Sequence, residues 1–315
     1  MISSSMRQSP VHRSSSSTTD ENYSSILTEM LPTPSTSHVP FERIYEPAED
    51  SYLLLDTLSS PSEVAFLNNR FGQCIRSAKG VQNASPPPLI VEIGTGSGVI
   101  LAFLTAHTRL VFGREDVLAL GTDVNSYACH ATRKTVMQAV EELLRDSGER
   151  QGTLAINSNV ATPAKHVETL VADLCAPFRP GLVDFLVFNP PYVPTPDSPP
   201  LPKHGVQDDL ASDNAPAPSF DQDSHLLALS YAGGVDGMET TKRLLAELPG
   251  VLDRERGVAY VLLCAQNKPE EVKNRIGRWG PGWAVETVSR SGKTAGWEKL
   301  EIIRIWRIRN EDLEP

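Results

Sequence analysis

The chain has 315 residues, of which 40% are hydrophobic and 22% are charged, a composition typical of a soluble globular protein. No uninterrupted apolar run approaches the roughly 18 to 20 residues that a membrane span requires, which disfavours a membrane protein. The formal net charge of -10 would repel a polyanion and weighs against nucleic acid as the main partner.

Residues 1–40 are rich in Ser, Thr and Pro and poor in large apolar side chains. Such a segment cannot bury enough surface to offset the entropy of ordering, so we predict a disordered tail. The first nineteen residues contain Arg7 and Arg13 but no acid, which leaves an organellar transit peptide as the less favoured alternative.

Residues 41–88 are predicted to form a helical cap, because EDSYLLLDTL (49–58) and the stretch to about Ser77 show helical periodicity. From residue 89 to 309, apolar strands alternate with helices. The expected strands are LIVEIG from Leu89, VLALGTDV (117–124), VETLVADL (167–174), VDFLVFNPP (183–191), GVAYVLLCAQ (257–266), WAVETVSRS (283–291) and EKLEIIRIWRI (298–308). The expected helices are VILAFLTAH (99–107), the stretch from Tyr127 to about Arg145, GMETTKRLLAEL (237–248) and KPEEVKNRIGRW (268–279).

This order predicts an α/β fold of the Rossmann-like type. Strands that alternate with helices imply right-handed crossovers and a doubly wound, mainly parallel sheet, here seven-stranded, to which a terminal hairpin adds antiparallel pairing. The segment 195–225 interrupts the pattern with six prolines and six aspartates against one lysine. We predict a flexible acidic insert over 197–225, directly after a Pro-Pro tetrapeptide.

The four cysteines are far apart and form no C-x-x-C pair, so the sequence gives neither a zinc ribbon nor a disulfide framework. We expect reduced thiols that pack as small apolar residues, no bound metal, and a cytoplasmic location with the nucleus as a further compartment. They are Cys74, Cys129, Cys175 and Cys264.

A glycine-rich turn follows the first strand, in the order Glu92-Ile93-Gly94-Thr95-Gly96-Ser97-Gly98. A turn of this kind between a strand and a helix lets the backbone approach a ligand closely. Its G-x-G-x-G spacing differs from the G-x-G-x-x-G fingerprint, which disfavours a dinucleotide. Alone the signal is weak, because glycine-rich turns also end strands for structural reasons.

Acids follow the next two strands. Asp123 ends the second strand and Asp173 the third, and ligands of open α/β sheets bind at this edge. A carboxylate at the second position can accept both ribose hydroxyls, and one at the third can accept a hydrogen bond from an adenine amino group. Either acid alone could equally be a helix N-cap or a turn residue. Together with the glycine-rich turn they favour S-adenosylmethionine as the cofactor.

The tetrapeptide Asn189-Pro190-Pro191-Tyr192 follows the apolar strand DFLVF. Its two prolines fix an extended backbone and remove N–H donors, so acceptors face the ligand. The Asn189 side-chain oxygen and the Pro190 carbonyl can each accept one N–H of an incoming –NH2 group, and Tyr192 can supply an aromatic wall. The tetrapeptide therefore predicts an amide or amine nitrogen as methyl acceptor, against the alternative of a turn that only ends a strand.

Six segments in order resemble the eukaryotic branch of the HemK-type glutamine methyltransferases. They are YEPAEDSYLLLD (45–56), VEIGTGSG (91–98), GTDVN (121–125), VADL (171–174), FNPPYVPTP (188–196) and YAGGVDG (231–237). The resemblance spans roughly residues 41 to 309. It implies a class I methyltransferase fold and N5-methylation of the glutamine in the Gly-Gly-Gln motif of the class I translation termination factor.

The resemblance also implies site residues and a partner. The family pattern places the cofactor among Ser51, Glu92, Gly94, Gly96, Asp123, Asp173, Leu174 and Asn189, and the glutamine among Asn189, Pro190 and Tyr192. Ser51 could instead belong to the N-cap of the helix at 51–58. The implied partner is an obligatory small zinc-binding activator subunit. We predict that it docks on the strand 167–174, because this strand lies at the sheet edge in such a fold and apolar edges favour pairing with another chain.

Three other functions stay open. An adenine-N6 DNA or RNA methyltransferase would use the same tetrapeptide, but it should carry a basic strand-binding face and a target-recognition domain. A protein lysine methyltransferase would need a base to deprotonate the lysine, and none is evident. An inactive adaptor could keep the fold, although the intact glycine-rich turn, acids and tetrapeptide disfavour it.

Overall fold

The computed structural model describes residues 31–72, 85–151, 163–202, 219–292 and 299–309, without the side chains of 147–151. The chain divides into two compact units, Met1–Pro32 and Thr33–Pro315, and every element named below belongs to the second. Most of the predicted tail lies outside the described residues. The last part of the tail, from residue 31 on, is described. Within it Val39 is buried and packs with Ile44. The folded chain thus begins before the predicted boundary at residue 40.

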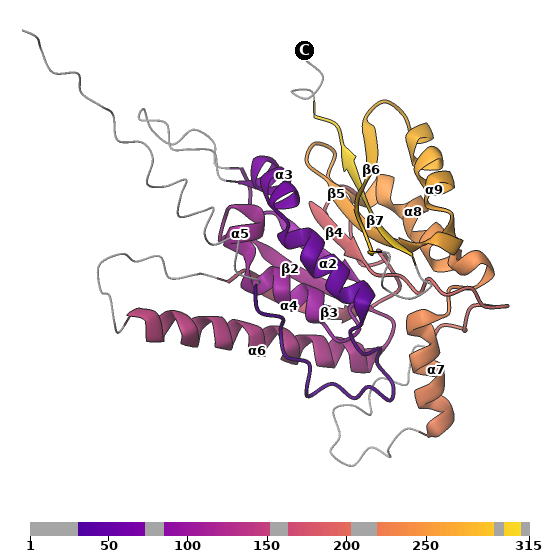
Figure 1. Ribbon diagram of the computed structural model, residues 1–315, viewed down its shortest axis with the longest axis horizontal. Coiled ribbons are helices and arrows are strands. Elements are labelled where there is room, and N and C mark those ends of the chain that lie inside the picture. Colours follow the sequence, from indigo (N-terminus) through magenta and orange to yellow (C-terminus); the bar gives the residue numbers. More distant parts are fainter. Residues whose placement is uncertain (1–30, 73–84, 152–162, 203–218, 293–298, 310–315) are drawn as a thin grey trace, which may run out of the picture. The chain divides into compact units, whose positions relative to one another are not determined.

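The described strands form one seven-stranded sheet in the order β3-β2-β1-β4-β5-β7-β6 (Figure 1). They are β1 (Leu89–Ile93), β2 (Leu118–Asp123), β3 (Lys165–Val171), β4 (Phe185–Phe188), β5 (Val258–Cys264), β6 (Trp283–Arg290) and β7 (Leu300–Arg307). Strands β1 to β5 pair in parallel, whereas β7 is antiparallel to both β5 and β6. The predicted doubly wound sheet with an antiparallel terminal hairpin is confirmed, and β3 is an edge strand as expected.

Helices cover both faces of this sheet, which explains why its central strands are apolar without alternation. On one face, α4 (Val99–Ala106) contacts β1, β2, α2 (Glu49–Ser59) and α6 (Ser126–Gln151), and all eight residues of α4 are buried. On the other face, α8 (Glu239–Val251) and α9 (Pro269–Ile276) share one apolar core with β1, β4, β5 and β7.

The predicted helical cap consists of two helices, α2 and α3 (Pro61–Phe71). Ser60 ends α2 and is the N-cap of α3. Pro61 lies in the first turn of α3, where its lack of a backbone N–H leaves no donor unsatisfied. The buried Glu63 fastens α3 to the sheet, because its Oε2 accepts hydrogen bonds from the Tyr260 hydroxyl at 2.6 Å and from Arg304 Nη1 at 2.7 Å.

Two helices were not predicted. The short α5 (Thr108–Phe112) follows α4, and α7 (Phe220–Tyr231) begins inside the predicted flexible insert 197–225. Ser219 and Gln222 form a capping box at the start of α7, which satisfies backbone donors that a loop would expose to water. Residues 220–225 are therefore helical, and residues 203–218 of the insert lie outside the described residues.

The described cysteines Cys129, Cys175 and Cys264 are free thiols and are buried, as predicted. None of the helices in the described part of the chain combines the length and the apolar character needed to cross a bilayer.

Candidate active site

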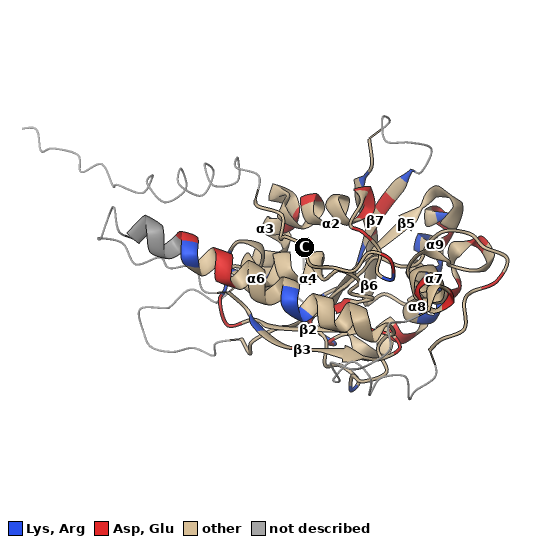
Figure 2. Cartoon of the chain, turned by 90° about the horizontal axis from the view of Figure 1, so that it is seen from below, with Lys and Arg blue, Asp and Glu red and all other residues tan. Residues whose placement is uncertain are grey.

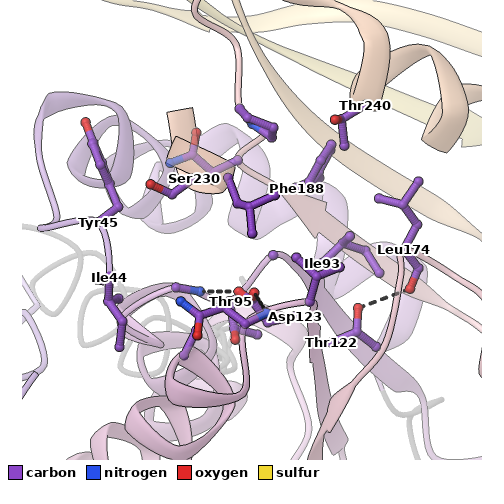
Figure 3. A pocket seen from close by; sticks show the side chains of 18 of the residues that line it. Ile44, Tyr45, Ile93, Thr95, Thr122, Asp123, Leu174, Phe188, Ser230 and Thr240 are labelled. Atoms are coloured by element: carbon purple, nitrogen blue, oxygen red, sulfur yellow. Dashed lines mark hydrogen bonds between the residues drawn. The ribbon is translucent and has the colours of Figure 1, made fainter. Parts of the chain in front are cut away.

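A cavity of about 270 Å³ lies at the carboxyl ends of β1, β2 and β4. Figure 3 shows Ile44 and Tyr45 on one side of it and Leu174 on the opposite side, with Thr95 and Asp123 between them. The predicted residues that line this cavity are Ser51, Glu92, Gly94, Gly96, Asp123, Asp173, Leu174 and Asn189. Residues separated by more than a hundred positions in the sequence are thus brought to one site.

The glycine-rich turn forms one wall of the cavity. The Gly94 N–H donates to the Thr122 carbonyl at 2.7 Å, which ties the turn to the end of β2. Gly96 has a φ of 50° and no atom within 4 Å of the position that a Cβ would occupy, so this part of the wall faces open space. The turn leaves room for a ligand against the backbone, as predicted.

Asp123 braces the turn from β2. Its Oδ2 accepts a hydrogen bond from the Gly96 N–H at 2.9 Å, and its Oδ1 accepts one from the Asn125 N–H at 2.8 Å. Burial raises the pKa of Asp123, and these backbone donors partly oppose that effect. The backbone N–H of Val124 also donates to this carboxylate, which keeps the capacity to accept a hydrogen bond from a ribose hydroxyl.

Glu92 lies on β1 and is 2% exposed. Its Oε2 accepts a hydrogen bond from the Leu101 N–H of α4 at 2.9 Å. Burial raises its pKa well above the usual range, the Leu101 N–H opposes this, and the nearby charge of Asp123 raises the pKa further. Two carboxyl groups therefore share a poorly solvated end of the cavity.

The segment after β3 contributes Asp173 and Leu174. The Asp173 carboxylate pairs with the guanidinium of Arg243 from α8, and both residues line the cavity. Leu174 has a φ of 47°, an unusual backbone conformation for a side-chain-bearing residue, and its carbonyl accepts a hydrogen bond from the Thr122 hydroxyl at 3.1 Å. The Arg243 partner was not predicted, and the role of Asp173 toward adenine stays a prediction.

The tetrapeptide after β4 presents alternate residues to the cavity. Asn189 and Pro191 line it, whereas Pro190 and Tyr192 are buried and do not. In an extended backbone successive side chains point to opposite sides, and the two prolines keep the tetrapeptide extended; Phe188, the last residue of β4, also lines the cavity. The Tyr192 side chain therefore does not form part of this cavity wall, and the role of the Pro190 carbonyl as an acceptor stays a prediction.

Asn189 has one satisfied and one unsatisfied end. Its Nδ2 donates to Asp50 Oδ2 at 3.2 Å, whereas its Oδ1 is buried without a hydrogen-bond partner among the described residues. A buried polar atom without a partner costs stability, so its persistence next to a cavity indicates a ligand that donates to it. The atom that was predicted to accept an N–H of the methyl acceptor is thus the one left free.

Ser51 lies beside Asp50 in the first turn of α2. Its N–H and hydroxyl both donate to Asp50 Oδ1, at 2.6 Å and 3.3 Å. The helix begins at Glu49 with Ala48 as its N-cap, so Ser51 is not the capping residue. Its place in the cavity wall is the one the family pattern implies.

Sequence reasoning missed several residues of the cavity wall. The Thr95 hydroxyl is buried in the wall and has no partner among the described residues, like Asn189 Oδ1. Arg43 joins the N-terminal segment to α7 through an ion pair with Asp223 at 3.1 Å, and it stacks on the Tyr127 ring at 4.7 Å. The residues of α7 that line the cavity are Leu226, Leu229 and Ser230. No local pattern marks these contacts, since the segments that meet lie far apart in the chain.

Comparisons with known proteins extend these observations. No family model matches the chain. It is 29% identical to the eRF1 methyltransferase catalytic subunit mtq2 of Schizosaccharomyces pombe over 89% of this chain and 98% of that protein. It is 27% identical to the methyltransferase HEMK2 of Homo sapiens over 88% of this chain and 97% of that protein, and 28% identical to HEMK2 of Mus musculus over 87% and 96%. The similarity covers the helical cap, the glycine-rich turn and the tetrapeptide together.

Proposed function

Because this chain is a HemK-type class I methyltransferase, homologous to mtq2 and HEMK2, we propose that it methylates the side-chain amide N5 of a protein glutamine. We propose the glutamine of the Gly-Gly-Gln motif in a class I translation termination factor as the substrate. The name of the S. pombe relative, an eRF1 methyltransferase, supports this choice.

The free Asn189 Oδ1 is the observation that carries the proposal. It is an acceptor at the cavity wall, so it suits a ligand group that donates, such as the –NH2 of a primary amide. An amide nitrogen has a delocalised lone pair and is a poor nucleophile. An acceptor that holds one of its N–H groups fixes its position and stabilises the positive charge that develops on nitrogen during methyl transfer.

The cofactor is S-adenosylmethionine, which supplies an electrophilic methyl group. The residues present fit it, because the turn at Gly96 leaves open space and the buried Thr95 hydroxyl lacks a partner. Asp123 would hold the ribose hydroxyls, and Ser51 and Glu92 line the same cavity. The apolar Phe188 and Leu174 also line it and would exclude water.

We propose that the chain works with a small zinc-binding activator bound along β3. This strand is at the edge of the sheet, and Val167 is 51% exposed on it. An edge strand with apolar side chains offers backbone groups for pairing and a surface for burial. Helix α6, which packs against β3, also carries two exposed apolar side chains, Met137 and Leu144.

The charges of the described helices support a protein substrate rather than a nucleic acid. Both basic and acidic side chains lie on α6 and α9 (Figure 2), and the chain carries a net charge of -10. A nucleic-acid methyltransferase would need a basic surface to follow the phosphate backbone.

Mass spectrometry tests the proposed function. The full chain, co-expressed with the activator, is incubated with labelled S-adenosylmethionine and a termination factor that contains the Gly-Gly-Gln motif. We expect a gain of one methyl group on the motif glutamine and none on a factor in which that glutamine is replaced by alanine. Labelling of a lysine or of an adenine-containing oligonucleotide, with an unmodified glutamine, would refute the proposal.

A further inference from the structure

Asp50, in helix α2, accepts hydrogen bonds from three residues of the candidate active site. It is 3% exposed, in the first turn of α2. Its Oδ1 accepts from the Ser51 N–H at 2.6 Å, which anchors the carboxylate to the helix. Its Oδ2 accepts from Asn189 Nδ2 at 3.2 Å and from the Tyr192 hydroxyl at 3.5 Å. One carboxylate thus connects the helical cap to both ends of the tetrapeptide.

These contacts decide which end of the Asn189 amide, in the cavity wall, is left without a hydrogen-bond partner. An ionised carboxylate accepts hydrogen bonds and donates none, so the amide must turn its NH2 group toward Asp50. Its oxygen is then the end that remains without a partner, as observed. The opposite rotamer would set the Asn189 oxygen against the carboxylate and present an NH2 group to the incoming amide nitrogen.

We infer that Asp50 is a positioning residue that fixes the hydrogen-bonding polarity of the acceptor site, an inference that rests on the proposed amide methylation. Asp50 itself lines the cavity, and the role inferred for it concerns its contact with Asn189. It acts through Asn189, by keeping an acceptor rather than a donor directed at the methyl-accepting nitrogen. The Tyr192 hydroxyl, which belongs to a buried residue outside the cavity wall, donates to the same carboxylate.

The substitution Asp50→Asn tests this inference because it changes little except polarity. The amide introduced at position 50 can keep its oxygen toward Ser51, but its NH2 group then faces Asn189. The Asn189 amide is expected to rotate and offer its oxygen to that group. The site loses its acceptor, and we expect kcat to fall about 100-fold, the effect of a misdirected reacting group. The KM for the termination factor and the affinity for cofactor should stay within about threefold.

A matched control and a rescue separate positioning from folding. Asp56→Asn makes the same change on an exposed position of α2 and should leave kcat unchanged. The double substitution Asp50→Asn with Asn189→Asp exchanges the two groups. The amide at position 50 then donates to a carboxylate at position 189, whose second oxygen again faces the cavity as an acceptor. We expect the double variant to recover activity to within about tenfold of wild type, because the hydrogen-bond polarity is restored.

A spectroscopic measurement separates this inference from the proposed function. In a ¹H–¹⁵N spectrum of the full chain, the Asn189 side-chain amide signal should shift in Asp50→Asn and stay in place in Asp56→Asn, whatever the substrate is. Wild-type turnover in Asp50→Asn, an unshifted Asn189 signal, or a double variant no more active than Asp50→Asn would overturn the inference. If the wild-type enzyme leaves the termination factor unmodified while the Asn189 signal still shifts in Asp50→Asn, the proposed substrate is rejected and the role of Asp50 is retained.

Discussion

The third glycine of the cofactor turn, Gly98, is predicted to be a site of stability rather than of binding. It is the N-cap of α4 and has a φ of 79°. A Cβ at this position would lie 2.6 Å from Thr132 Cα and 2.9 Å from Thr132 Cβ, on α6. The nearest atom belongs to the backbone of a packed helix, so rotation of a side chain cannot relieve the overlap.

The cost of Gly98→Ala has two parts. The left-handed backbone conformation costs a residue with a Cβ about 1 to 2 kcal/mol. The overlap with α6 adds about 1 to 3 kcal/mol, the range for overpacked cores. The sum, about 2 to 5 kcal/mol, is a large part of the roughly 5 to 15 kcal/mol that stabilises an ordinary domain. We therefore expect a marked loss of unfolding free energy.

Urea unfolding followed by circular dichroism measures this loss, and two glycines provide controls. Gly96→Ala carries the backbone cost alone, since no atom lies within 4 Å of its Cβ position, so it should destabilise by about 1 to 2 kcal/mol and mainly weaken cofactor binding. Gly250→Ala, on an exposed position of α8, should be neutral or stabilising by up to about 1 kcal/mol. Equal destabilisation by Gly98→Ala and Gly96→Ala would refute the role given to the α4–α6 contact.

Three further outcomes follow from the site. Asn189→Ala should abolish methyl transfer while cofactor binding, measured by calorimetry, is largely kept; wild-type turnover would contradict the acceptor role. Asp123→Ala should weaken cofactor binding by about 1 to 3 kcal/mol, the cost of losing hydrogen bonds to a charged group, and an unchanged affinity would remove the ribose assignment. The raised pKa of Glu92 means that its stabilising contribution is present below its unfolded-state pKa, near 4.5, and is lost as the pH rises through its folded-state pKa. Glu92→Gln keeps an acceptor for the Leu101 N–H, so its thermal midpoint without cofactor should increase relative to wild type as the pH rises, and a pH-independent difference would contradict this.

The sheet and its cofactor edge could be predicted because their signals are local. The run Leu89–Ile93 is apolar except for Glu92 and is followed by a glycine-rich turn, and both the strand and the turn are found there. Helix α7 was missed because it follows a segment rich in Pro and Asp and none of its residues is fully buried, so it carries no clear apolar stripe. The spacing of Ser219 and Gln222 was the available signal for its start.

The contacts that complete the site could not be predicted in the same way. Asp50 and Asn189 are 139 positions apart, and only the folded chain shows that they share a hydrogen bond. Asp50 lies in the EPAEDS segment that carries the resemblance, but nothing in that segment marks it as the partner of Asn189. The exclusion of Tyr192 from the cavity wall was predictable, because two prolines keep the chain extended and successive side chains of an extended chain point to opposite sides.

Strand β4 also determines which kinds of sequence change the acceptor site can tolerate. Phe188 is paired on one side with Ile93 of β1 and on the other with Val261 of β5, so the frame in which the tetrapeptide leaves the sheet is set by two neighbours at once. One residue inserted between Phe188 and Asn189 would shift the tetrapeptide by one place and put the asparagine at the buried position that Pro190 now occupies. Length is thus a stricter requirement here than side-chain chemistry: a substitution alters one group, whereas a single inserted residue would displace every group of the tetrapeptide at once.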